Sequence, residues 1–453
     1  MTQPNIIIFF SDDHGQWALP CYGNTELRTP NLDRLAARGT VFENAFTPIP
    51  VCSPARASFF TGLMPSRHGV HDFISARPEF HRRNWLDGLD SLPLMLQRAG
   101  YQCGFSGKWH LGNDETPQPG FDYWYSMSGA YPVRHDGAQE ISDNGEVAEK
   151  PGYLTDNITD GAIRFLKERD RDRPFFLFVA YYATHSPWEG HPDRFVEPYR
   201  NASFRDIPEA SRIFGDYDVL NLEAPAMTPE AIQEARAQYY GAVTHIDAGL
   251  GRVLDEVRRE GEEALCVYTS DHGLCLGHHA IWGKGNGTRP ANMIEESIRI
   301  PMVVARTDGA APHQRRTELV DHTDLHRTVA AIAAAGAEHS DGQARPGHDF
   351  SGLLAGGTSW PKRVQFGEYG PLRMARDDRF KAIVRTDGPA ELYDLSAPDA
   401  ESRNLAGTPE GEPQLRRLAN EIHAFFAAPG SGGDKRWKDA ESFQFNTMES
   451  WKL

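Results

Sequence analysis

Short apolar runs that end in polar, chemically reactive residues are the dominant pattern of this chain. Four of them cover residues 5–10, 174–182, 264–269 and 300–305. Continuous apolar runs of this length are typical of strands that are buried on both faces, and therefore of a parallel sheet covered by helices. We predict that these four runs are strands of one such sheet.

Amphipathic segments lie between the apolar runs. Apolar positions recur at helical spacing in residues 30–38, 91–99, 155–168 and 229–259. Because predicted strands alternate with predicted helices, the sequence indicates a doubly wound α/β core, a mostly parallel sheet flanked by helices.

The pattern changes after about residue 360. Three short strand-like segments, 363–369, 380–385 and 391–395, follow one another closely, and a helical segment covers 413–427. We therefore predict a catalytic domain over 1–360. A smaller C-terminal subdomain with an antiparallel sheet is expected over 361–453, ending in a surface tail from residue 430.

Acidic pairs and a histidine follow three of the predicted strands. Asp12 and Asp13 follow the first, His185 the second, and Asp271 and His272 the third. Ligands bind at the carboxyl ends of strands in such sheets, so these side chains should converge on one rim. Clustered carboxylates repel one another unless a cation neutralises them, and three carboxylates with a neutral donor suit calcium before magnesium. An isolated Asp-Asp pair in a turn is the simpler alternative.

Residues 52–56, Cys-Ser-Pro-Ala-Arg, form the most distinctive local motif. Ser53 suits a helix N-cap, Pro54 the first helical position and Gly62 the helix end. A helix N-terminus attracts anions, so Cys52, with Arg56 nearby, is a candidate nucleophile or the precursor of one. A small buried cysteine that only packs is the alternative.

Four basic side chains also stand out. Lys108 and Lys284 have glycines close by, which allow a ligand to approach the backbone, and each offers a point charge to an anion. His110 could carry a proton, and His185 is placed to act as a general acid. Ordinary surface lysines and structural histidines are the alternatives. Three residues on a predicted helix are interpreted as structural: His322, Asp324 and His326.

Bulk properties limit the possible functions. The 453 residues carry a net charge of -16, which argues against a nucleic acid or an anionic membrane as partner. The five cysteines show no C-x-x-C pair, which argues against a disulfide framework or a structural zinc site. No apolar run near the start is long enough for a signal sequence, so we expect a cytoplasmic location unless a leader has been removed. Nothing in the sequence predicts an oligomeric state.

Several motifs together resemble the type I sulfatases of the alkaline-phosphatase superfamily. The resemblance covers nearly the whole chain, with the motifs in the family's order, and it implies an alkaline-phosphatase-like fold. The matching segments are Asp12-Asp13, the C-x-P-x-R signature at 52–56, G-K-W-H-x-G at 107–112, Asp271-His272-Gly273, and the C-terminal segment 391–395 with Asn404-Leu405.

The resemblance implies that Cys52 is oxidised to formylglycine by a formylglycine-generating enzyme. The hydrated gem-diol would be the nucleophile, held by Arg56, and one of its oxygens would complete a metal site with Asp12, Asp13, Asp271 and His272. A diol oxygen is a good calcium ligand, whereas a thiolate is a poor one.

The resemblance also implies roles for the basic residues. Lys108 and Lys284 would bind the sulfate oxygens together with the metal, and His185 would protonate the leaving alcohol. His110 would remove the proton of the second hydroxyl and so release sulfate. Several sulfatases have Asn where His272 stands; a nitrogen ligand favours manganese or zinc more, although calcium remains the first expectation.

Two other functions stay open from the sequence. One is a phosphonate or phosphate monoester hydrolase of the same superfamily, and the other is a non-catalytic binding protein that keeps the fold. The complete set of basic residues argues against the second. The aromatic and polar loops 73–85, 123–143 and 187–218 favour a sulfated carbohydrate over an aryl or choline ester.

Overall fold

The computed structural model describes residues 3–74, 78–128, 133–208, 217–221, 223–309, 313–334, 339–386, 388–397 and 400–430. The predicted tail, apart from Gly430, lies outside the described residues. The same holds for residues 75–77, 129–132 and 209–216 of the predicted specificity loops.

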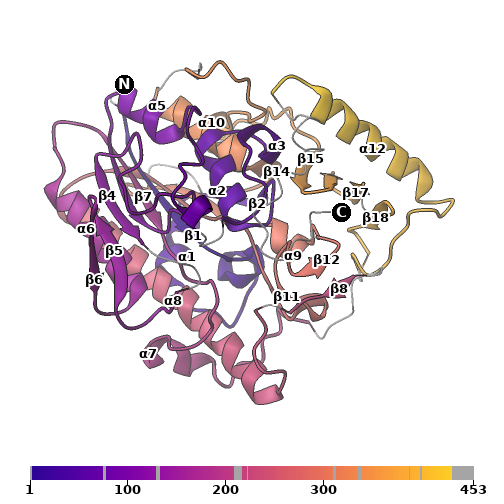
Figure 1. Cartoon of the computed structure of the whole chain (residues 1–453), viewed down its shortest axis with the longest axis horizontal. Helices are drawn as coiled ribbons and strands as arrows, with labels where there is room; N and C mark the ends of the chain where they lie inside the picture. The colour runs from indigo at the N-terminus through magenta and orange to yellow at the C-terminus, as the bar shows by residue number, and fades with distance from the viewer. Residues whose placement is uncertain are drawn as a thin grey trace.

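Ten strands of the described residues form one mixed, mostly parallel sheet (Figure 1). Its order is β14 (Gln314–Asp321), β2 (Thr40–Phe46), β13 (Met302–Arg306), β9 (Ala264–Ser270), β1 (Asn5–Ser11), β7 (Phe175–Ala180), β3 (Gln102–Gly107), β4 (Tyr123–Met127), β5 (Gln139–Asp143) and β6 (Glu146–Lys150). Strand β1 pairs in parallel with β7 and β9, as expected for strands buried on both faces. The predicted fold class is confirmed.

The fourth apolar run is a strand, but its predicted direction is wrong. Strand β13 runs antiparallel to both β9 and β2. The segment between β9 and β13 contains only short elements, of which α9 (Glu295–Ile298) is the last, and no long crossover helix. A parallel connection needs such a crossover. Without it the chain stays near the carboxyl ends of the strands and enters β13 in the opposite direction.

Helices cover both faces of the sheet (Figure 1). One face packs against α1 (Pro30–Ala36), α6 (Leu154–Glu168) and α8 (Pro229–Arg259). The other packs against α2 (Cys52–Thr61), α5 (Leu92–Arg98) and α10 (His322–Ile332). The four helices predicted between the strands are confirmed, with ends that differ by two residues at most. In the described part of the chain, no helix combines the length and the apolar character that a membrane span requires.

A separate antiparallel sheet follows in the chain. It contains β15 (Gln365–Tyr369), β16 (Leu372–Arg376), β17 (Phe380–Arg385) and β18 (Glu391–Asp394), and α12 (Glu412–Ala427) packs beside it. Strand β16 was not predicted, because two arginines interrupt its apolar pattern. Both are buried, and one of them, Arg376, pairs with Glu295. The boundary at residue 360 stays a prediction, since Lys362 Nζ donates to Asp321 Oδ2 at 2.6 Å across it.

The small sheet supports the loop between β2 and α2. The Glu368 N–H donates to the Pro48 carbonyl oxygen at 3.0 Å. Ile49 and Val51 of the loop share an apolar cluster with Met374 and other residues of the small sheet. The loop that leads to Cys52 is therefore held by the small sheet through a hydrogen bond and apolar contacts.

Gly107, at the end of β3, is a position where we expect a methyl group to be strongly destabilising. Its φ is +127°, and a Cβ there would lie 1.9 Å from the Ala180 carbonyl oxygen. That oxygen also accepts the Lys108 N–H at 2.8 Å. Replacing Gly107 by Ala should lower the free energy of unfolding by about 3 kcal/mol or more, measured by urea unfolding.

The matched control for this prediction is Gly100→Ala. Gly100 also has a positive φ, +95°, but a Cβ there would meet nothing within 4 Å. It should therefore show only the backbone cost of about 1–2 kcal/mol. Equal losses in the free energy of unfolding at the two positions would show that the close contact with Ala180 does not cause the destabilisation at Gly107.

Candidate active site

The carboxyl ends of the strands bring the predicted site residues together. They follow the ends of β1, β3, β7 and β9, or lie in α2 and in the segment between β9 and β13: Asp12, Asp13, Cys52, Arg56, Lys108, His110, His185, Asp271, His272 and Lys284. Most of these side chains are fully or almost fully buried. The structure shows the expected convergence of these side chains on one rim of the sheet.

Cys52 is the first residue of α2. The helix begins at Cys52 with Val51 as its N-cap, so the predicted N-cap role of Ser53 is wrong. The Ser53 hydroxyl instead accepts the Ile74 N–H at 3.0 Å, which ties the loop after α3 (Pro65–His68) to the helix start. Gly62 ends the helix with φ +68°, as predicted.

Arg56, one turn later, connects the ends of three strands. It is fully buried. Its Nε donates to Asp271 Oδ2 at 3.1 Å, one terminal nitrogen donates to Asp12 Oδ2 at 3.3 Å, and the other donates to the Lys108 carbonyl oxygen at 2.6 Å. Burial raises the pKa of Asp12, but the charges of Lys108 and Arg56 hold it at about 2.

Four side chains form a cluster that fits a cation. Ligand atoms of Asp12, Asp13, Cys52 and His272 all lie within 4.8 Å of one another. Among the described residues, the buried Asp13 Oδ2 has no hydrogen-bond partner. A buried carboxylate oxygen without a donor is costly, and a bound cation would remove that cost.

Asp271 lies beside this cluster. Its Oδ1 accepts the N–H groups of Asp13 at 3.2 Å and His272 at 2.8 Å, and its Oδ2 accepts from Arg56. Burial, and next the charge of Asp12, raise the pKa of Asp271 to about 7. Crowded carboxylates of this kind favour an added cation. Asp271 therefore stays a predicted metal ligand.

Positive groups surround the Cys52 sulfur. Lys284 Nζ lies 3.4 Å from Sγ and His272 Nε2 lies 3.3 Å from it. Burial by itself would raise the pKa of the thiol, but Lys108, Lys284 and His272 lower it well below its usual value. The site is therefore suited to a negatively charged group at this position.

Lys108 and His110 lie on the same loop, but their side chains have different surroundings. Lys108 pairs with Asp12 and lies 5.1 Å from the centre of the Tyr182 ring. His110 Nε2 lies 3.1 Å from the Ile74 carbonyl oxygen. Burial, and next the charge of Lys108, lower the pKa of His110 to about 4. His110 is thus neutral near pH 7 and able to accept a proton.

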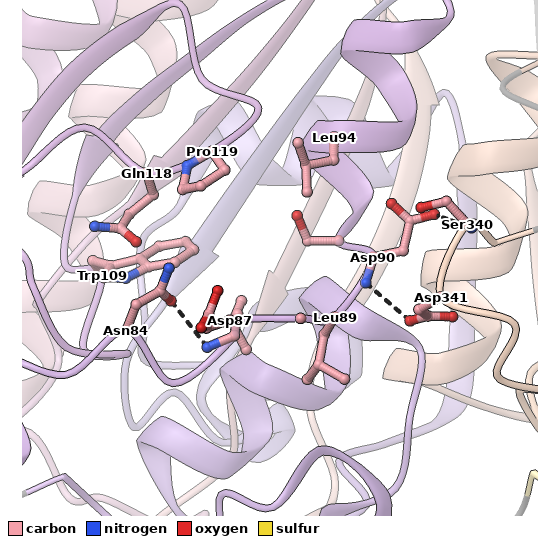
Figure 2. A pocket seen from close by; sticks show the side chains of 13 residues that line it. Asn84, Asp87, Leu89, Asp90, Leu94, Trp109, Gln118, Pro119, Ser340 and Asp341 are labelled. Carbon is pink, nitrogen blue, oxygen red and sulfur yellow. Dashed lines mark hydrogen bonds between the residues drawn. The ribbon is translucent and has the colours of Figure 1, made fainter.

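Trp109, between them, packs elsewhere. Its ring contacts the Phe60, Phe105 and Trp124 rings. Trp109 also borders a cavity of about 350 Å³, next to Gln118 (Figure 2). None of the predicted site residues borders that cavity. This cavity is therefore lined by residues other than those of the predicted site.

His185 is partly exposed, with 14% of its side chain accessible, and Lys284 is buried. His185 Nε2 is 3.9 Å from Asp13 Oδ2, and its Nδ1 is 2.7 Å from the Ser186 carbonyl oxygen. Lys284 Nζ donates to Asp13 Oδ1 at 2.6 Å. The His185 carbonyl oxygen accepts a hydrogen bond from His135 at 2.8 Å if His135 Nε2 carries the proton. The sequence analysis did not single out His135.

Glu223 is the second residue that the sequence analysis missed. Its Oε1 lies 3.8 Å from Lys284 Nζ, and its carboxylate forms a compact group with Asp13 and His185. No motif surrounds Glu223 in the sequence. Only the three-dimensional path of its segment brings it to the site.

The residues interpreted as structural take up structural contacts. His322 Nε2 lies 2.9 Å from the Ser270 carbonyl oxygen, and His326 Nδ1 lies 3.0 Å from the Phe59 carbonyl oxygen. Asp324 forms a capping box with Asp321 at the start of α10. The contacts of His322 and His326 connect α10 with the end of β9 and with α2.

The profile of the Sulfatase family matches residues 4–335. The chain belongs to the sulfatase family. The resemblance stated from the motifs is therefore confirmed, and with it the expected enzyme class, a sulfuric ester hydrolase.

Individual sulfatases show how far the similarity reaches. The chain is 28% identical to an N-acetylglucosamine-6-O-sulfatase of Bacteroides thetaiotaomicron, over 67% of this chain and 62% of that protein. It is 27% identical to a choline-sulfatase of Rhizobium meliloti, over 99% of this chain and 93% of that one. A solved structure in complex with its substrate D-glucosamine-2-N,6-O-disulfate superposes with a TM-score of 0.80 at 24% identity, covering 99% of this chain and 100% of that one.

Proposed function

We propose that this sulfatase hydrolyses a sulfate monoester of a carbohydrate, with a nucleophile that originates from Cys52. The observation that carries the proposal is the environment of the Cys52 sulfur, where Lys284 and His272 lie within 3.4 Å beside a group of buried carboxylates. Two of the similar proteins are named for, or bound to, sulfated amino sugars, which supports a carbohydrate substrate.

Cys52 would act after oxidation to formylglycine, whose hydrated form supplies two hydroxyls, one to attack sulfur and one to expel sulfate afterwards. Arg56 would hold this group in its orientation. Since Cys52 is 2% exposed within α2, the formylglycine-generating enzyme would have to act before the helix packs into the core.

The remaining residues would bind and move protons. Lys108 and Lys284 would hold the sulfate oxygens and stabilise the charge that develops on them. His185 would donate a proton to the leaving alcohol. His110, neutral near pH 7, would accept the proton of the second hydroxyl.

The predicted metal would be held by Asp12, Asp13, Asp271, His272 and an oxygen of the modified Cys52. A divalent cation, calcium first and manganese or magnesium next, would supply charge to bind and polarise the sulfate. The orphaned Asp13 Oδ2 supports the fit of this donor set to a cation.

Removal of the metal should destabilise the protein as well as inactivate it. A chelator should lower the Tm, and calcium at about 100 times its Kd should restore about 2.7 kcal/mol of stability. Differential scanning fluorimetry with calcium, magnesium, manganese and zinc measures this directly.

Two variants test whether the effect belongs to this site. Asp13→Asn should lose the calcium-dependent change in Tm, because the orphaned carboxylate oxygen becomes part of a neutral amide. Asp160→Asn, an exposed carboxylate paired with Arg252 on the surface, should keep it. An unchanged Tm of the wild-type protein in chelator and in calcium would contradict the metal assignment.

The function itself is tested by product release. Protein made with an active formylglycine-generating enzyme should release sulfate from N-acetylglucosamine 6-sulfate with a higher kcat/KM than phosphonate product from a matched phosphonate monoester. A clear preference for the phosphonate ester would reassign the protein to the other hydrolase class.

A further inference from the structure

Side chains of the active site differ in their exposure to solvent, and this difference indicates where the leaving alcohol lies. The side chains of Asp12, Asp13 and Asp271 are fully buried, whereas those of His185 and Glu223 are 14% and 18% exposed. In the proposed function the sulfate group binds at the buried end, next to the lysines. The larger alcohol portion of the substrate must then extend past His185 and Glu223 toward solvent.

The residues just before Glu223 are held in place by hydrogen bonds to the segment that carries Lys284. Strand β8 (Asp218–Val219) pairs with β12 (Thr288–Arg289), and the Leu220 N–H donates to the Gly287 carbonyl oxygen at 2.9 Å. The Asn221 side chain accepts the Trp282 N–H at 3.3 Å. Both anchors lie on the segment that carries Lys284, so Glu223 and Lys284 are positioned together.

The Glu223 carboxylate has hydrogen-bonding capacity left over. Its Oε1 is 3.8 Å from Lys284 Nζ, which is an ion pair without a short hydrogen bond. Its Oε2 is buried and has no hydrogen-bond partner in the described part of the chain. An ionised carboxylate only accepts hydrogen bonds, and a sulfate ester has no donor to offer. The Ser186 hydroxyl is the one side-chain hydrogen-bond donor recorded for this carboxylate in the described part of the chain, and Oε2 is left for a donor on the alcohol portion.

A second metal ion is a weaker explanation for this carboxylate. Asp13, His185 and Glu223 do lie close enough to hold a cation. However, the Lys284 ammonium already lies 2.6 Å from Asp13 and 3.8 Å from Glu223. It supplies the positive charge that a second ion would bring.

An aromatic cage for a quaternary ammonium group is also absent among the described neighbours. Trp188 lies three residues after His185 and Trp282 lies two residues before Lys284. Their rings pack against each other with centroids 5.6 Å apart. Arg236 lies 5.9 Å from the centre of the Trp282 ring. These two rings are already in contact with each other and with Arg236, so they do not form a cage for a cation without N–H groups.

We propose that Glu223 is a specificity-determining residue that accepts a hydrogen bond from a hydroxyl or N–H group of the leaving alcohol, close to the ester oxygen. The proposal rests on the proposed sulfatase function and narrows its substrates to alcohols with such a donor. Sites with a buried acceptor reject analogues that lack the donor, because the acceptor is then left unpaired.

The test compares Glu223→Leu and Glu223→Gln with the wild-type protein on three substrates. N-acetylglucosamine 6-sulfate carries donors, choline sulfate carries a cation without N–H groups, and 4-nitrophenyl sulfate carries neither. Leucine should lower kcat/KM on the sugar sulfate by about 10- to 100-fold, and glutamine, which keeps a carbonyl acceptor, should lower it less. Because Glu223 also pairs with Lys284, some loss is expected on 4-nitrophenyl sulfate, but leucine should lower kcat/KM there about tenfold less than on the sugar sulfate. The control Glu168→Gln removes a carboxylate at the end of α6 that is 64% exposed and should change neither reaction.

The outcomes separate this proposal from the proposed function. Equal losses with Leu and Gln on all substrates would mean that Glu223 only supports Lys284 by its charge, and would overturn the proposal. Wild-type activity on 4-nitrophenyl sulfate or choline sulfate but not on the sugar sulfate would also overturn it, while leaving the sulfatase function intact. No sulfate release from any substrate by protein with a verified aldehyde would overturn the proposed function.

Discussion

Cys52→Ser is expected to abolish turnover while the fold stays intact. Serine has one hydroxyl, so after attack on sulfur it would stay sulfated, with no second hydroxyl from which His110 could take a proton. Sulfate release under multiple turnover should fall by about 10⁴-fold or more. The change from Sγ to Oγ is small and lies where Lys284 and His272 provide donors within 3.4 Å. Stability should therefore change by about 1 kcal/mol at most.

The matched control is Cys103→Ser. Cys103 is also fully buried, but it lies in β3 and its Sγ is 3.7 Å from the Pro93 carbonyl oxygen, away from the site. It should keep its activity. Steady turnover by the Cys52→Ser protein, at a rate near that of the wild type, would show that the nucleophile does not originate from Cys52.

Arg56→Met should have the largest effect on stability. The substitution leaves Asp12 and Asp271 without the guanidinium that bonds both of them, and all three side chains are fully buried. Removing one partner of a buried ion pair costs about 3–5 kcal/mol, because the remaining charges are uncompensated. Urea unfolding in the presence of chelator isolates this cost from any metal effect.

Arg56→Lys separates charge from geometry. Lysine keeps the positive charge and should recover part of the lost stability. It cannot donate to Asp12, Asp271 and the Lys108 carbonyl oxygen at once, as Arg56 does. Activity should therefore stay low. If the methionine protein were as stable as the wild type, the two carboxylates would not depend on Arg56.

The sequence predicted the parts of this structure that depend on local pattern. The apolar runs before Asp12, His185 and Asp271 are strands, and their polar ends meet on one rim because parallel strands share an edge. The helices were equally predictable, because their apolar faces repeat at helical spacing. In α8 both predicted ends agree with the structure.

Other features depend on contacts that no local pattern records. The direction of β13 follows from the missing crossover, and β16 is hidden by arginines whose partners are distant in sequence. Ser53 looked like an N-cap but bonds Ile74 instead. Glu223 reaches the site only because β8 pairs with β12.

The most direct test of the account is the mass of the peptide that carries Cys52, measured on a preparation whose sulfate release is assayed in parallel. Protein made with an active formylglycine-generating enzyme should show an aldehyde in place of the thiol, and activity should rise in proportion to the aldehyde fraction. Full sulfatase activity in protein that retains the Cys52 thiol would contradict the account.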